Sequence, residues 1–239
     1  MSKNPSAAIL IIGNEILSGR TLDTNTQTIA KALGEIGVVV FETRTVPDIK
    51  QVIIESVLAL SAKYDYVFTT GGIGPTHDDI TSLAISEAFS VPYTRNETIY
   101  QLLQEYCKET GHPMNKAREK MAFIPEGSTL IPNNVSKVPG FSIKNVYCLA
   151  GVPEIMESML NLVIPFLKHG RVVKTLSHTV MIGESKIAEQ FEILQNKYPS
   201  VDMGSYPFTK DGIHGTSLVL RSNNYQDLEQ AFHDLTHLI

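Results

Sequence analysis

The sequence predicts an α/β protein whose main sheet is mostly parallel and doubly wound, followed by a small α+β domain. Short apolar runs alternate with helical patterns through the first 90 residues, at spacings that suit right-handed crossovers. Three expected strands, those ending at Gly13, Thr70 and Ala150, are followed by polar or glycine-rich turns. After His169 and Gly170, apolar and polar residues alternate as they do in antiparallel strands. We therefore expect one domain at residues 1–170 and a second at 171–239.

The first half of the chain gives three strand–helix pairs, each a buried apolar run followed by a stretch with helical periodicity. The expected strands are 7–13, 38–45 and 66–70. The first expected helix begins near residue 26, the second spans 49–62 and the third 80–89. Between the first strand and its helix, residues 14–25 read as a polar loop anchored by Ile16 and Leu17. Asp48 is expected to cap the second helix, and Asp78 or Asp79 the third.

The rest of the first domain is more irregular, and the second domain has β-α-β-β-α order. Helices are expected at 97–110, 114–121 and 154–168, and a buried strand at 146–150. Pro165 should kink or end the helix that contains it. In the second domain we expect strands at 171–182, 201–206 and 214–221, and helices at 185–197 and 225–238.

Composition excludes several classes of protein. With 20 basic and 25 acidic residues the net charge is −5, and without a basic cluster we expect no nucleic-acid partner. Cys107 and Cys148 lie far apart, which favours buried free thiols in a reducing compartment. The run Ala7–Ile12 is too short for a signal-peptide core or a membrane span, so we expect a cytoplasmic protein without membrane attachment.

The stretch Tyr66–Thr81 carries the strongest functional signal. A buried strand breaks at Gly71, Gly72 and Gly74 and restarts as a helix, a turn that offers backbone N–H groups to phosphate. The adjacent Asp78 and Asp79 would repel a bare phosphate, but a divalent cation can bind carboxylate and phosphate oxygens together. The alternative is an ordinary strand-to-helix turn with an aspartate cap.

Three stretches also resemble a known family. Residues 70–81 (Thr-Gly-Gly-Ile-Gly-Pro-Thr-His-Asp-Asp-Ile-Thr), 13–26 and 151–153 (Gly-Val-Pro) together resemble the N-terminal part of the CinA family, of the molybdopterin-binding (MoCF) type. They also resemble the molybdopterin-binding-like domain of eukaryotic FAD synthase, in which Gly204-Ser205-Tyr206-Pro207 has a counterpart.

The resemblance implies a three-layer, MogA-like α/β sandwich that assembles as a dimer or trimer. It implies hydrolysis of ADP-ribose, FAD or a related nucleotide with Mg²⁺, Mn²⁺ or Co²⁺, and a monovalent cation such as K⁺ is a further candidate cofactor. Asp48 and Asp79 match two functional aspartates of related adenylyltransferases, and we expect them to be catalytic.

The expected site joins the three turns at one edge of the sheet, where such folds place their ligands. Metal ligands would be Asp48, Asp78, Asp79 and Glu15. Substrate or phosphate would contact Gly71, Gly72, Ile73, Gly74, Pro75, Thr76, Ser18, Asn25, Gly151, Val152 and Pro153.

Two departures from the family pattern leave other functions open. Ile155 stands where an acidic residue is usual, with Glu154 one place early, and Asn14 replaces an acidic residue. One alternative is the binding of molybdopterin with adenylyl transfer in molybdenum-cofactor synthesis. The other is a non-catalytic module that binds a nucleotide or pterin.

Overall fold

The computed structural model describes residues 4–210 and 212–238, so the outer ends of the two predicted domains, residues 1 and 239, lie outside it. The chain forms two compact units that divide between Gly170 and Arg171. Each unit has its own hydrophobic core, and each is described by itself.

The first unit is built on a six-stranded sheet, and four of its strands follow the predicted apolar runs. Its strand order is β2 (Val39–Val46), β1 (Ser6–Ile12), β3 (Tyr66–Thr70), β8 (Val146–Leu149), β7 (Gly140–Ile143) and β6 (Thr129–Ile131). The first four strands, which follow those runs, are parallel, and β7 and β6 are antiparallel to their neighbours. The mostly parallel sheet is therefore confirmed.

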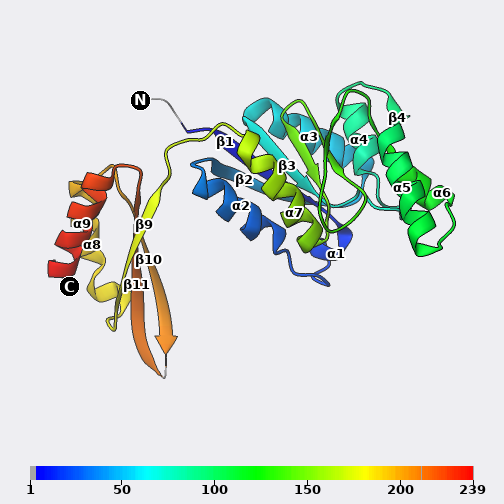
Figure 1. Cartoon of the computed structure of the whole chain (residues 1–239). Helices are drawn as coiled ribbons and strands as arrows, with labels where there is room; N and C mark the ends of the chain where they lie inside the picture. Colours follow the sequence, from blue (N-terminus) through cyan, green and yellow to red (C-terminus); the bar gives the residue numbers. More distant parts are fainter. Residues whose placement is uncertain (1–3, 211, 239) are drawn as a thin grey trace. The chain divides into compact units, whose positions relative to one another are not determined.

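Helices cover both faces of this sheet and complete three layers (Figure 1). One face packs against α2 (Asn25–Glu35) and α7 (Pro153–Val163), and the other against α3 (Lys50–Lys63), α4 (Thr81–Ala88) and α5 (Glu97–Thr110). Because side chains alternate along a strand, β1 sends Ala7, Ile9 and Ile11 into the first core and Ala8, Leu10 and Ile12 into the second.

The remaining elements of this unit are short. They are α1 (Asn14–Leu17), β4 (Tyr93–Arg95), α6 (Lys116–Lys120), β5 (Phe123–Pro125) and the 3-10 turn Ile164–Phe166. The prediction of a continuous loop at 14–25 is wrong at α1, a single turn too short to show helical periodicity. The prediction for Pro165 is confirmed, because α7 stops at Val163 and the chain continues as the 3-10 turn.

Both predicted aspartate caps are wrong. Helix α3 begins after Ile49 and α4 after Ile80, and in the described structure no side chain caps either helix. The Asp48 carboxylate instead accepts a hydrogen bond from the backbone N–H of Asn14, at 2.9 Å. Asp79 accepts from the Thr76 N–H, at 2.7 Å. Asp48 therefore joins two loops at the edge of the sheet, whereas Asp79 closes a turn within its own loop.

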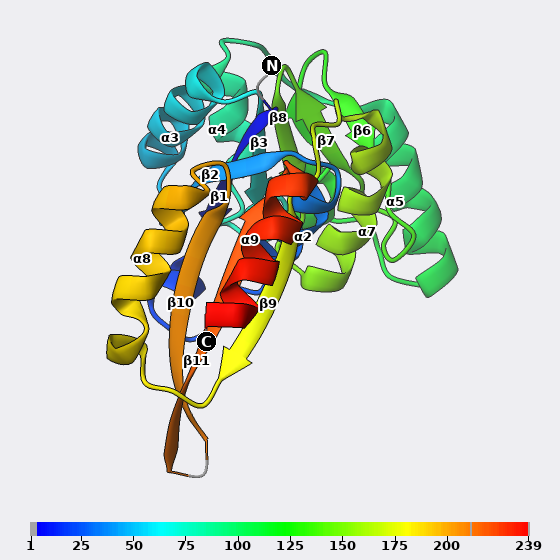
Figure 2. The ribbon, with the colours of Figure 1, turned by 90° about the vertical axis from the view of Figure 1, so that its left-hand side faces the viewer.

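The second unit has the predicted β-α-β-β-α order. Its antiparallel sheet runs β10 (Asp202–Lys210), β11 (Ile213–Ser222) and β9 (Lys174–Val180). The 3-10 turn Glu184–Lys186 precedes α8 (Ala188–Lys197), and α9 (Tyr225–Leu238) ends the unit. Both helices pack on one face of the sheet (Figure 2). Among the helices of the described residues, none is both long and apolar enough to cross a bilayer.

Candidate functional site

The turns that follow β1, β3 and β8 meet at the carboxyl edge of the first sheet. Gly71, after β3, and Gly151, after β8, approach so closely that a Cβ on Gly151 would lie 3.3 Å from the Gly71 Cα. These turns line a pocket of about 1260 Å³. The convergence follows from the topology, because parallel neighbouring strands release their next residues at the same edge.

The glycine corner is defined here as residues 71–74. Gly71 and Gly72 have φ values of 99° and 69°, in the region that favours glycine. A Cβ on Gly71 would lie 2.1 Å from the carbonyl oxygen of Ile12. The buried Thr81 bonds to the carbonyls of both glycines, through its hydroxyl to Gly71 (3.0 Å) and its N–H to Gly72 (2.9 Å).

These contacts orient the corner for an anion. With the two carbonyls bonded to the start of α4, the backbone N–H groups of Gly72, Ile73 and Gly74 make no hydrogen bond to an acceptor in the described part of the chain. Consecutive free N–H groups in a left-handed turn form a concave site for anions. Phosphate is the anion that such strand-to-helix turns commonly bind.

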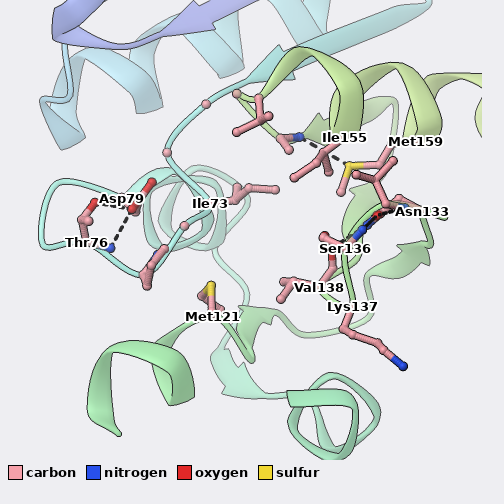
Figure 3. Close-up of a pocket in the computed structure, with 18 of the residues that line it drawn as sticks. Ile73, Thr76, Asp79, Met121, Asn133, Ser136, Lys137, Val138, Ile155 and Met159 are labelled. Atoms are coloured by element: carbon pink, nitrogen blue, oxygen red, sulfur yellow. Dashed lines mark hydrogen bonds between the residues drawn. The ribbon is translucent and has the colours of Figure 1, made fainter. Parts of the chain in front are cut away.

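Asp79 is held beside this corner by Thr76. Its Oδ2 accepts hydrogen bonds from both the N–H and the hydroxyl of Thr76, and the pair is visible in Figure 3. A Cβ on Gly74 would lie 2.8 Å from the same oxygen, so glycine is the residue that lets the carboxylate approach the loop. The Oδ2 of Asp48 accepts from Asn14, which ties the end of β2 to the turn after β1.

All four predicted metal ligands, Glu15, Asp48, Asp78 and Asp79, line the same pocket. The pKa of Asp48 is raised, first by burial and further by the negative charges of Glu15, Asp78 and Asp79, against the opposing hydrogen bond from Asn14. The pKa of Asp78 is lowered, first by the neighbouring Thr76 side chain, with smaller contributions from the positive charges of His77 and Lys120. The Asp48 side of the pocket thus gathers four acidic side chains.

These carboxylates are not grouped closely enough to hold a metal ion by themselves. They suit a cation that binds together with a phosphate. Among the described residues, no three His, Cys, Asp or Glu side chains are grouped to hold an ion. Mg²⁺ typically uses only one or two carboxylates, and substrate phosphates and waters complete its shell. After burial, the neighbouring carboxylates also contribute to the raised pKa of Asp48, and a cation among them would offset their mutual repulsion.

The opposite wall of the pocket was not predicted. It is made by α5, the region of α6 and the loop at 133–138, and it includes Tyr106. Met121 and Val138 also belong to this wall (Figure 3). The Asn133 side chain bonds to Val138 O, at 2.8 Å, and accepts from the N–H of Val135, at 3.0 Å, so this loop is preformed. No motif marks these residues in the sequence.

Other predicted residues differ in how they meet the pocket. Ile73, Pro75, Val152 and Pro153 line it with the glycines. Ser18 is not among the residues that line the pocket, and its hydroxyl donates to Glu15 O at 3.2 Å. Asn25 lines a smaller cavity behind the corner. The side chain of His77, in the same loop as Asp78 and Asp79, is 99% exposed.

The structure thus defines a two-unit α/β protein with a glycine-cornered pocket at the carboxyl edge of its main sheet. Residues 8–169 match the family described as the probable molybdopterin binding domain, and residues 174–239 match the middle domain of FAD synthase. The chain belongs to this molybdopterin-binding-domain family, and its relatives include CinA-like proteins.

A protein of Pyrobaculum calidifontis is 35% identical, with 85% of this chain and 81% of that protein covered. A CinA-like protein of Flavobacterium psychrophilum is 34% identical over 81% of this chain, which spans about half of that relative (49%). The crystal structure of the protein CinA, with unknown function, from Thermoplasma acidophilum is 31% identical. It matches with a TM-score of 0.63 over 69% of this chain and 99% of that one.

Proposed function

We propose that this protein is a divalent-metal-dependent pyrophosphatase that hydrolyses ADP-ribose, FAD or a related nucleotide. The observation that carries this proposal is the shared pocket. Its glycine corner offers free N–H groups, and beside it Asp48, Asp79 and Glu15 concentrate negative charge. A pyrophosphate with a bound cation complements both features, because its oxygens accept from N–H groups while the cation meets the carboxylates.

In this proposal, separate residues bind the phosphate and hold the metal ion. The N–H groups of the glycine corner bind and orient one phosphate. Asp48 and Asp79, with Asp78 and Glu15 next to them, hold the ion or its waters. A bound divalent ion supplies charge neutralisation at the phosphoryl oxygens and lowers the pKa of a coordinated water. Thr76 fixes Asp79 in place, since its N–H and hydroxyl both bond to that carboxylate.

The test is an assay of product formation from ADP-ribose, FAD and NAD with Mg²⁺, Mn²⁺ or Co²⁺, each with and without K⁺. Asp79→Asn and Asp48→Asn should each lower turnover by about 100-fold or more, the upper range for loss of a metal-site partner. Glu154→Gln is the matched control, because Glu154 is exposed on the first turn of α7. Absence of product with every metal, or full turnover by Asp79→Asn, would refute the proposal.

A second candidate is the binding of a pterin phosphate with adenylyl transfer, and the family match at residues 8–169 favours it. The same corner would bind the phosphate of the pterin. Molybdopterin with ATP and Mg²⁺ should then give an adenylylated product, which mass spectrometry detects. Ligand binding without any product would instead support a non-catalytic module, as Ile155 in the pocket wall allows. Assembly as a dimer or trimer is a further expectation, measurable by light scattering.

A further inference from the structure

A small annex adjoins the glycine corner. It measures about 70 Å³ and is lined by residues of the turns after β1, β3 and β8. The annex and the main pocket share lining residues, among them Glu15, Gly71 and Gly151. The annex therefore lies next to the proposed phosphate-binding site at the glycine corner. At about 30 Å³ for each water, it has room for roughly two waters or hydroxyl-sized groups. That is far below the pockets of about 300–1,000 Å³ that hold whole small molecules.

Asn25, at the start of α2, lines this annex, and its side chain holds an unpaired acceptor. The residue is only 6% exposed. Its Nδ2 donates to Gly151 O at 2.9 Å, and because a carbonyl can only accept, this bond fixes which end of the amide is nitrogen. The buried Oδ1 has no hydrogen-bond partner among the described residues. A buried acceptor without a donor is unfavourable, so the site favours an incoming N–H or O–H group.

The neighbouring groups do not supply that donor. Asp23 is itself occupied, accepting from the N–H of Asn25 at 2.9 Å and from the Thr26 hydroxyl at 2.5 Å. The Glu15 carboxylate, also on the annex wall, adds acceptor oxygens. A phosphate cannot satisfy Asn25, because its oxygens are acceptors too. The annex therefore suits a hydroxyl or amino group that sits a few bonds away from a phosphate.

We propose that Asn25 is a specificity residue that accepts a hydrogen bond from a ribose hydroxyl of the ligand. This inference rests on the proposed function, in which a phosphate binds at the glycine corner. The hydroxyls of a ribose lie within a few bonds of the phosphate and fit the annex, whereas a pterin or adenine ring does not. The ligand is then a ribonucleoside diphosphate or a larger ligand that contains one. A deoxyribonucleotide and inorganic pyrophosphate should bind more weakly.

Calorimetric titration with Mg²⁺ and ADP, 2′-deoxy-ADP or 3′-deoxy-ADP tests this without any mutation. The wild-type protein should bind one of the deoxy analogues about tenfold or more weakly than ADP, because Asn25 is then left unpaired. In Asn25→Leu this preference should fall below about twofold. Asn145→Leu is the matched control, since both ends of the Asn145 amide are bonded, for example to Tyr64 O and the Ser61 hydroxyl. It should keep the wild-type preference.

Equal affinity of the wild-type protein for ADP and both analogues would overturn the inference. It would mean that an ordered water, and not the ligand, donates a hydrogen bond to the Asn25 oxygen. Failure of ADP to bind at all would overturn it as well. The proposed hydrolysis is judged separately, by product formation. A ribose preference in binding without turnover would support Asn25 as the specificity residue while refuting the pyrophosphatase.

Discussion

The substitution Gly71→Ala tests whether the glycine corner needs its glycine. The new Cβ would lie 2.1 Å from Ile12 O, a backbone atom that cannot rotate away, and φ is 99°. A left-handed conformation costs an L-residue about 1–2 kcal/mol. Overpacking costs about 1–3 kcal/mol more. We therefore expect the free energy of unfolding to fall by about 2–5 kcal/mol, within the usual stability of a domain of about 5–15 kcal/mol.

Gly127→Ala is the control for this prediction. Gly127 also has a positive φ, 79°, but a Cβ there would meet nothing within 4 Å. Its cost should be that of the backbone alone, about 1–2 kcal/mol. Urea unfolding followed by far-UV circular dichroism measures both variants. If both lose the same stability, the close approach of Gly71 to β1 contributes nothing and the account of the corner is wrong.

Three further predictions follow from the titrating groups. Burial, and after it the neighbouring carboxylates, raise the pKa of Asp48, so the ionised Asp48 destabilises the fold at pH 7 and Asp48→Asn should be more stable there. This advantage should disappear on acidification below the unfolded pKa of 3.8, in urea titrations at each pH. Hydrogen bonds from Tyr64, Lys63 and Arg44 lower the pKa of Glu42 from 4.5 to about 2. Its contribution should be complete above pH 4.5 and lost as the pH falls towards 2. Glu42→Gln should therefore have a lower free energy of unfolding than the wild type above pH 4.5, and this difference should shrink as the pH falls towards 2. The same difference at pH 2 as at pH 7 would contradict this prediction. Burial raises the pKa of the Cys148 thiol to about 12, so it should resist alkylation at pH 8 until urea unfolds the protein, as mass spectrometry would show.

Much of the fold was predictable because it depends on local periodicity. The run at 66–70 and the helices at 97–110 and 225–238 were predicted at their observed bounds. The predicted cap at Asp48 failed for a tertiary reason, whereas Asp79 bonds within its own loop. Aspartate before a helix usually bonds to the N–H groups of that helix, but the N–H groups available to Asp48 and Asp79 belong to Asn14 and Thr76. Sequence preference cannot weigh a partner 34 residues away.

The site was predictable on one wall only. The glycines and aspartates carry a recognisable pattern, and the parallel topology brings their turns together. The opposite wall depends on where α5 and the loop at 133–138 pack, and the side chains of Tyr106 and Met121 look like ordinary amphipathic positions in the sequence. The unpaired oxygen of Asn25 is likewise a property of the folded chain, since it arises only once Nδ2 meets Gly151.

The most direct test of the central claim is a crystal structure of the protein with ADP-ribose and Mn²⁺, with the ion located by its anomalous scattering. We predict a phosphate on the N–H groups of residues 72–74, and an Mn²⁺ peak that touches this phosphate and Asp48 or Asp79, directly or through one water. A phosphate bound elsewhere, or an ion remote from both carboxylates, would contradict the account.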